Sequence, residues 1–232
     1  MSIADNVRRV RAEIAEAAIS VGRDPGGITL VAAAKQNTAE RVREAVLAGV
    51  DAVGENRVQE LTEKKSRGAY GAAPLHFIGH LQTNKVGAVV GQCSLIESAD
   101  SQRLLEAISR RALALGIRQD VLLEVNIGAE NSKSGVLPGE LEPLLEFAAV
   151  LPGLRVAGLM AIPPFFSQNG SSRHFFDKMY RLFIDIGEKK YDNVDMLFLS
   201  MGMSSSFIDA IRSGSNMVRV GTAIFGERIY TA

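Results

Sequence analysis

The sequence is poor in the features that several classes of protein depend on. Its single cysteine, Cys93, cannot form a disulfide within the chain, which is typical of a reducing compartment. No apolar run reaches the roughly 18 to 20 residues that a membrane-spanning helix needs. The first six residues also lack the basic and apolar regions of a signal peptide. These absences predict a cytoplasmic protein that does not bind membranes.

The chain also lacks an excess of either charge: 26 Lys and Arg residues balance 26 Asp and Glu residues, and the formal net charge is zero. A chain without excess positive charge is poorly suited to non-specific binding of nucleic acid. Its 47% hydrophobic and 22% charged residues are ordinary for a globular protein, and 232 residues fit one or two domains. No linker or low-complexity segment divides the chain, and the longest irregular stretch, 163–170, reads as a loop. We therefore predict one domain, 1–232.

Short apolar runs alternate with stretches of helical spacing, and this alternation predicts the fold. The runs lie at 28–35, 51–55, 75–80, 94–98, 120–127, 154–162, 196–202 and 217–226. Strands separated by helices form parallel βαβ units, and eight units close into a TIM-type (β/α)8 barrel, for which about 250 residues is usual. The alternative is an open doubly wound sheet, but that fold normally has a glycine-rich turn after its first strand, and residues 33–36 contain no glycine.

Helical periodicity is clearest at 40–48 and 101–115, where Gly49 and Gly116 stand at the positions of C-terminal caps. A further helix is expected before the first strand, because one stripe of the N-terminal segment is apolar. Its members are Ile3, Val7, Val10, Ile14 and Ala18.

Polar residues gather where the predicted strands end, which is the active-site face of a barrel. Period-two alternation places Lys35 on the face of Val31, and it places Glu124 and Arg219 on inward faces too. We expect Glu124 to pair with Arg219 or Lys35. His76 and His80 lie about 13 Å apart along a strand at about 3.3 Å per residue, so we expect no shared metal ion.

Lys35 is the residue whose position says most about the chemistry, because it ends an apolar run at the mouth of the predicted barrel. Loss of water and a neighbouring cation favour a neutral amine, which attacks carbonyl groups to form a Schiff base. The plainer interpretation is a solvated lysine at the end of a strand.

Two segments rich in glycine and hydroxyl side chains have the character of a phosphate site. They are 200–206, which precedes a helical stretch at 207–212, and 221–223. Small residues let backbone N–H groups approach a phosphate, and TIM-type barrels frequently bind phosphate after strands seven and eight. The alternative is that these residues only make turns.

Six motifs then resemble one family in order along nearly the whole chain. They are GENRVQE at 54–60, HFIGHLQTNK at 76–85, SKSG at 132–135, GLMAI at 158–162, SMGMS at 200–204 and RVGTAIFG at 219–226. The sequence resembles the pyridoxal phosphate homeostasis protein family, whose members have the barrel of the alanine racemase N-terminal domain (fold type III).

The resemblance implies a cofactor, pyridoxal 5′-phosphate (PLP), and a role for particular residues. It implies that PLP is held as a Schiff base on Lys35, with Arg219 facing the pyridine nitrogen and Asn56 lining the ring pocket. The phosphate would be held by Ser200, Gly221 and Thr222, with help from the backbone of Met201. His80 and Met160 would form the pocket wall. One departure is that Gln36-Asn37-Thr38 stands where many relatives have Thr-Lys-Pro.

Three functions remain open, of which the resemblance favours a carrier or regulator of PLP with little or no turnover. We also expect transient contacts with apo-enzymes and a monomer or weak dimer. A PLP-dependent amino-acid racemase would need a second acid–base group, which related racemases take from a tyrosine of an additional domain. We expect no such domain in 232 residues, and no tyrosine at a strand end among Tyr70, Tyr180, Tyr191 and Tyr230. A class I aldolase is more remote, because its lysine lies on a later strand.

Overall fold

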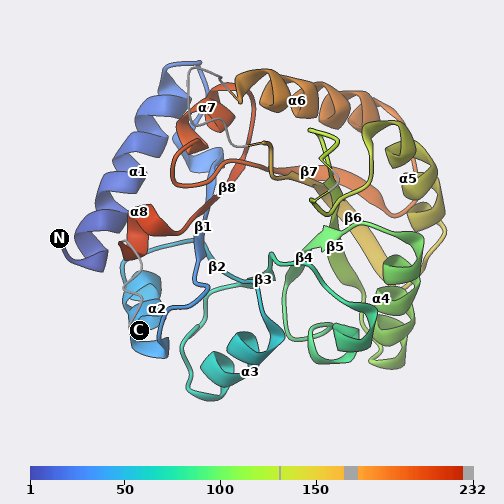
Figure 1. The fold of residues 1–232 in the computed structure, drawn as a ribbon, viewed down its shortest axis with the longest axis horizontal. Coiled ribbons are helices and arrows are strands. Elements are labelled where there is room, and N and C mark those ends of the chain that lie inside the picture. Colours follow the sequence, from blue (N-terminus) through green and yellow to red (C-terminus); the bar gives the residue numbers. More distant parts are fainter. Residues whose placement is uncertain (131, 165–171, 227–232) are drawn as a thin grey trace.

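A computed structural model of the protein describes residues 1–130, 132–164 and 172–226. Within them, eight parallel strands pair in chain order, and β8 returns to β1 to close a barrel (Figure 1). The strands are β1 (Thr29–Ala33), β2 (Ala52–Glu55), β3 (Leu75–Phe77), β4 (Leu95–Ala99), β5 (Gln119–Val125), β6 (Leu154–Ala161), β7 (Val194–Ser200) and β8 (Met217–Val220). The barrel predicted from the alternating runs is confirmed, and the open sheet is wrong.

Helices surround the strands in an outer ring (Figure 1). They are α1 (Ile3–Ile19), α2 (Ala39–Leu47), α3 (Val58–Ser66), α4 (Gln102–Ala114), α5 (Leu141–Ala149), α6 (Arg173–Glu188), α7 (Phe207–Arg212) and α8 (Thr222–Phe225). A 3-10 helix, Thr83–Ala88, connects β3 to β4. Short 3-10 turns also precede β1 (Pro25–Gly27) and α5 (Pro138–Glu140).

The predicted N-terminal helix is confirmed as α1, and it packs across α2, α7 and α8. Ser2 begins it with a capping box, in which the Ser2 hydroxyl accepts the Asp5 N–H and the Asp5 carboxylate accepts the Ser2 N–H. The apolar stripe predicted from the sequence is buried in the structure. Burial of each large apolar side chain contributes roughly 1.5–3 kcal/mol, so this docking fixes the helix against the barrel.

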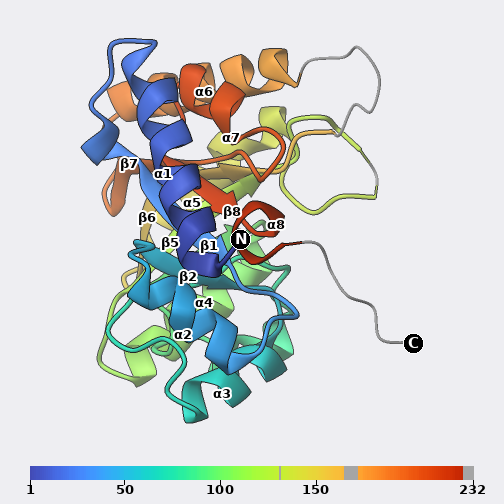
Figure 2. The ribbon, with the colours of Figure 1, turned by 90° about the vertical axis from the view of Figure 1, so that its left-hand side faces the viewer.

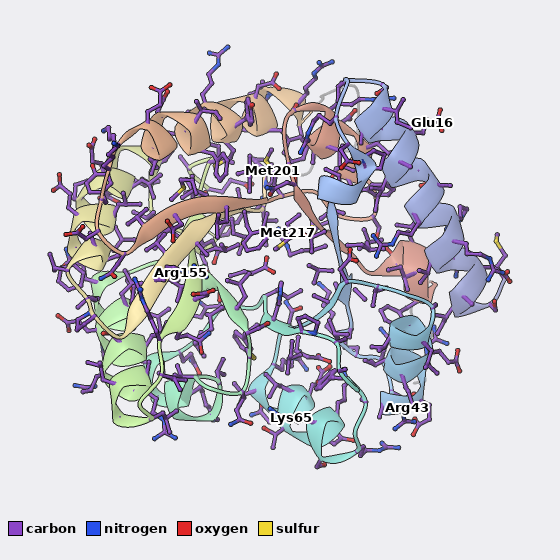
Figure 3. The ribbon with its side chains drawn as sticks, turned by 180° about the vertical axis from the view of Figure 1, so that it is seen from behind. Glu16, Arg43, Lys65, Arg155, Met201 and Met217 are labelled. Atoms are coloured by element: carbon purple, nitrogen blue, oxygen red, sulfur yellow. The ribbon has the colours of Figure 1, made fainter. Side chains whose placement is uncertain are left out.

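Two apolar clusters form the core, one outside and one inside the ring of strands. The larger lies between the strands and helices. The inner cluster consists of Val31, Ala52, Leu95, Leu122, Ala157, Met160 and Met217. Figure 3 labels one member of each cluster, with Met217 inside the ring and Met201 outside it. Buried polar groups of the same strands complete the interior, and they belong to the site described below.

The boundary of the last strand differs from the prediction. The apolar run 217–226 was expected to be one strand, but β8 ends at Val220 and Thr222–Phe225 form α8. Gly221 has φ −111° and ψ −81°, which leaves the extended region, and its carbonyl accepts the N–H groups of Ile224 and Phe225.

Two other expectations concern a loop and the absence of a membrane-spanning helix. The loop predicted at 163–170 lies mostly outside the described residues. Among the helices that the structure describes, no segment is long and apolar enough to cross a membrane.

Candidate functional site

Lys35 follows β1 by two residues, where the chain leaves the barrel wall. Val31 is part of the inner cluster and Ala33 is buried, so continued alternation aims Lys35 at the mouth of the barrel. Its side chain is half-buried. The loop between β5 and α5, together with α8, lies on this same side of the barrel, at the right in Figure 2.

A buried charge network lies inside the barrel around Glu97 of β4. The Glu97 carboxylate contacts His76 Nδ1 at 2.7 Å, accepts the Ser200 hydroxyl at 2.6 Å and lies 3.6 Å from Arg219 Nη1. Arg219 also donates to Ser200 Oγ and to Ala161 O. Burial acts to raise the pKa of Glu97, but the hydrogen bond and charge of His76, the charge of Arg219 and the bond from Ser200 hold it below its ordinary value.

Glu124 was expected to pair with Arg219 or Lys35. The structure places Glu97 against Arg219 as its ion-pair partner, with Glu124 buried nearby. Burial and the charge of Asp100 raise the pKa of Glu124 to about 7, and Arg219 opposes this rise. The interior thus contains a carboxyl group that titrates near neutral pH.

A second polar group forms where β7 and β8 end. The backbone N–H groups of Gly221 and Ala223 both donate to Ser204 Oγ, at 3.1 and 3.2 Å. Thr222, beside them, is exposed. A Cβ atom at Gly221 would lie 3.4 Å from Ala33 O, so this loop lies close against the end of β1. The two segments predicted to bind phosphate therefore meet each other, and they meet near the strand that leads to Lys35.

Asn56 lies just beyond β2, and its Oδ1 atom is buried without a hydrogen-bond partner among the described residues. The loop after β3 packs directly against it, because a Cβ at Gly79 would lie 2.3 Å from Asn56 O. Only glycine permits this approach. An unpaired acceptor in a site of this kind is suited to a ligand that carries a hydroxyl or N–H donor.

Met201, expected to help hold a phosphate, lies apart from these polar groups. Its side chain belongs to the outer core, and its backbone N–H donates to Met217 O at 3.1 Å. Of the two residues expected at the pocket wall, Met160 is buried inside the barrel. His80 is exposed, with its Nδ1 atom 3.3 Å from Ser134 Oγ of the loop after β5.

Three residues of the site were missed in the sequence. Glu97 shares an inward face with Leu95, and that alternation could have revealed it. Ser204 lies within the predicted phosphate segment, but nothing in the sequence separates it from its serine neighbours. Lys64 is a buried cation on α3 that donates to Ala34 O, and no apolar pattern marks it.

The lysine after β1, the buried arginine on β8 and the polar loops after β7 and β8 define a class of protein. The model of the alanine racemase N-terminal domain matches residues 2–229 of the chain. The protein named "Pyridoxal phosphate homeostasis protein" in Aquifex aeolicus (strain VF5) is 40% identical over 230 residues, which are 99% of this chain and 100% of that protein. The chain belongs to the pyridoxal phosphate homeostasis protein family, with the barrel of the alanine racemase N-terminal domain. The family predicted from the motifs is confirmed.

Solved structures agree with this assignment. A crystal structure of an unknown protein from Bifidobacterium adolescentis is similar with a TM-score of 0.90 and 39% identity, over 96% of this chain and 94% of that one. The structure of PipY from Synechococcus elongatus PCC7942 with PLP bound has a TM-score of 0.79 and 30% identity, over 92% of this chain and 100% of that one.

Proposed function

We propose that this protein binds PLP and serves the intracellular homeostasis of vitamin B6, as a store, carrier or regulator of the cofactor with little or no turnover. The observation that carries the proposal is that the loops after β7 and β8 meet next to Ala33, at the end of the strand that leads to Lys35, while Arg219 is buried on β8, the strand paired with β1. The names of the relatives and the PLP-bound PipY structure support it.

The described residues fit the chemistry of PLP. The cofactor supplies an aldehyde that condenses with an amine and a pyridine ring that withdraws electrons. An amine stands at Lys35, an unpaired buried acceptor at Asn56 and a buried guanidinium at Arg219. Ser204 Oγ accepts the N–H groups of Gly221 and Ala223, and its own hydroxyl proton, together with the hydroxyl of exposed Thr222, is a donor of the kind that a phosphate requires.

The residues of the site divide between holding the aldehyde, lining the ring and holding the phosphate. Lys35 holds the cofactor covalently as a Schiff base, and Asn56 lines the ring. Gly221 and Thr222 hold the phosphate, and Ser204 joins them because its hydroxyl already contacts the Gly221 N–H. Ser200 and the backbone of Met201, expected at the phosphate, support the same end of β7; Ser200 acts by holding Arg219 through its hydroxyl.

Arg219 limits the chemistry that the bound cofactor would perform. A guanidinium stays charged, so facing the pyridine nitrogen it disfavours protonation of the ring and weakens the ring as an electron sink. Tyr70 is buried, and its hydroxyl donates to Glu55 on the outer side of the ring of strands. Tyr230 lies outside the described residues. This arrangement supports a holder of PLP over an amino-acid racemase.

The decisive experiment is spectroscopic. Protein purified with PLP should absorb at about 420 nm, and borohydride should remove this band and fix the cofactor to the Lys35 peptide, as mass analysis would show. Lys35→Ala should lose the band and the label, while Lys65→Ala, an exposed lysine of α3, should keep both. A colourless wild-type protein that PLP does not reconstitute would refute the proposal.

The carrier role has its own test. Incubated with L-alanine and other common amino acids, the PLP-loaded protein should produce no D-enantiomer above the rate of free PLP. Efficient racemisation by the wild type, lost in Lys35→Ala, would favour the racemase instead.

The proposal extends to the localisation, oligomeric state and partners of the protein. We place it in the cytoplasm as one domain over 1–232, a monomer or weak dimer without nucleic-acid or metal partners, in transient contact with apo-enzymes that need PLP. Balanced charge supports the absence of a nucleic-acid partner. Sedimentation at several concentrations tests the oligomeric state, and transfer of cofactor to an apo-enzyme in the presence of a scavenger of free PLP tests the contact.

A further inference from the structure

A buried ion cluster lies beneath the turn that carries Lys35, outside the ring of strands. Lys64 of α3 is 4% exposed, and its Nζ atom lies 2.8 Å from Glu55 Oε1 and 3.1 Å from Glu60 Oε2. Glu60 and Lys64 are four residues apart, so they share one face of α3. Glu55 belongs to β2 and is fully buried, and its Oε2 atom has no hydrogen-bond partner among the described residues.

This cluster binds the peptide groups on both sides of Lys35. Lys64 Nζ donates to Ala34 O at 2.8 Å, and the Gln36 N–H donates to Glu60 Oε2 at 2.7 Å. The turn needs such support, because Gln36 has φ +61°, a left-handed conformation that non-glycine residues rarely adopt.

Two further hydrogen bonds lie within the turn itself, so the cluster is what connects the turn to α3. The Asn37 N–H donates to Ala34 O at 3.1 Å, and Asn37 Nδ2 donates to Lys35 O at 3.2 Å. These bonds are local to the turn, whereas those of Lys64 and Glu60 tie it to another element. A buried ion pair is seldom more stabilising than apolar packing of the same size. Its placement at the two peptides next to Lys35 therefore indicates a role in positioning.

We propose that Lys64, held by Glu55 and Glu60, is the positioning residue of the Lys35 site: it fixes the turn so that the Lys35 amine meets a bound aldehyde. This inference rests on the proposed function. In the step concerned, the neutral Lys35 amine attacks the aldehyde carbon, a C=N bond replaces the C=O bond, and the oxygen leaves as one water molecule. Lys64 itself touches neither the aldehyde nor the amine in this account.

The test separates positioning from general weakening of the pocket by using two ligands. PLP can bond to Lys35, whereas pyridoxamine 5′-phosphate has the same ring and phosphate but an amine in place of the aldehyde. In Lys64→Met the dissociation constant for PLP should rise by about tenfold or more, since a misplaced amine loses the covalent bond. The constant for pyridoxamine 5′-phosphate should change by less than about threefold.

Lys65→Met is the matched control, because Lys65 is the next residue of α3 (labelled in Figure 3) and bonds Gln92 at the surface. It should bind both ligands as the wild type does. Glu60→Ala is the second variant, chosen because it removes the acceptor of the Gln36 N–H while the Lys64–Glu55 pair remains. Glu60→Ala should show the same selective loss of affinity for PLP, and it keeps the test available if Lys64→Met does not fold.

Each outcome decides the matter. Equal losses for the two ligands in every folded variant, or no loss at all, would overturn the positioning role. If the wild type and Lys65→Met form no borohydride-trapped bond at Lys35, the proposed function fails and not this inference alone. Selective loss of PLP in Lys64→Met or Glu60→Ala, with the wild type labelled at Lys35, supports it.

Discussion

Individual charges inside the barrel are arranged around one cation. Arg219 is buried, and burial lowers its pKa while Glu97 and Glu124 oppose that change. Hydrogen bonds and the charges of His76 and Arg219 lower the pKa of Glu97, whereas for Glu124 the charge of Asp100 adds to the effect of burial and only the charge of Arg219 opposes it. The two carboxyl groups therefore respond differently to pH, and Glu124 is the one that titrates in the physiological range.

Replacing Glu124 by Gln should stabilise the protein in a pH-dependent way. The folded-state pKa of Glu124, about 7, exceeds the ordinary 4.5, so between these values the folded state binds more protons and stability falls as pH rises. Glu124→Gln removes this fall. The free energy of unfolding of the variant relative to that of the wild type should increase by about 2–3 kcal/mol between pH 5 and pH 8.

Urea denaturation at the two pH values measures this difference. Glu63→Gln, at an exposed position of α3, is the control and should change the free energy of unfolding by no more than about 0.5 kcal/mol at either pH. A Glu124→Gln variant whose advantage stays constant or shrinks as pH rises would contradict the assignment.

Among the elements, those with strong periodicity could be predicted from the sequence. The apolar runs between helical stretches identified all eight strands, period two gave the inward direction of Arg219, and the stripe of α1 identified the first helix. The helix α3 gave no such signal, because its buried face includes Lys64 next to Leu61. The strand β8 was extended too far because Ile224 and Phe225 continue its apolar pattern, and only the backbone of Gly221 ends it.

The site was predictable to the extent that it depends on alternation along one strand. Alternation along β1 singled out Lys35, and the family resemblance singled out Asn56; they lie just beyond β1 and β2. Contacts between strands were not predictable. Pairing of Glu97 with Arg219 joins β4 to β8 across the barrel, and no local pattern distinguishes it from a pair with Glu124.

Helix caps give a second prediction, because two serines begin helices in different ways. Ser2 caps α1 with a side-chain bond to the Asp5 N–H, whereas Ser101 begins α4 with no side-chain bond to the helix. Ser2→Ala should cost about 1 kcal/mol and lower the melting temperature by about 3 °C. Ser101→Ala should change it by less than about 1 °C. Circular dichroism on heating measures both, and equal melting temperatures for the two variants would refute the difference.

The whole molecule depends on closure of the barrel, and the closure is weakest between β7 and β8. Only Ser200 and Met217 are register partners there, whereas β5 and β6 share a long ladder. Side chains supplement the few backbone hydrogen bonds that cross this seam. Asn216 Oδ1 accepts the Leu199 N–H and its Nδ2 donates to Leu197 O, both at 2.7 Å. This seam also holds Ser200 beside Arg219, so closure and the proposed cofactor site share the same support.

Asn216→Ala should therefore loosen the seam before the rest of the barrel. The buried Leu199 N–H loses its acceptor, which costs about 1–3 kcal/mol, and local opening should speed hydrogen exchange at the Leu199 amide more than in β5 or β6. Asn216→Asp keeps an acceptor for Leu199 and should lose less protection. Exchange measured by NMR distinguishes the two. Uniform acceleration across all strands would mean that Asn216 supports the fold as a whole, and unchanged exchange at Leu199 would show that the ladder alone closes the barrel.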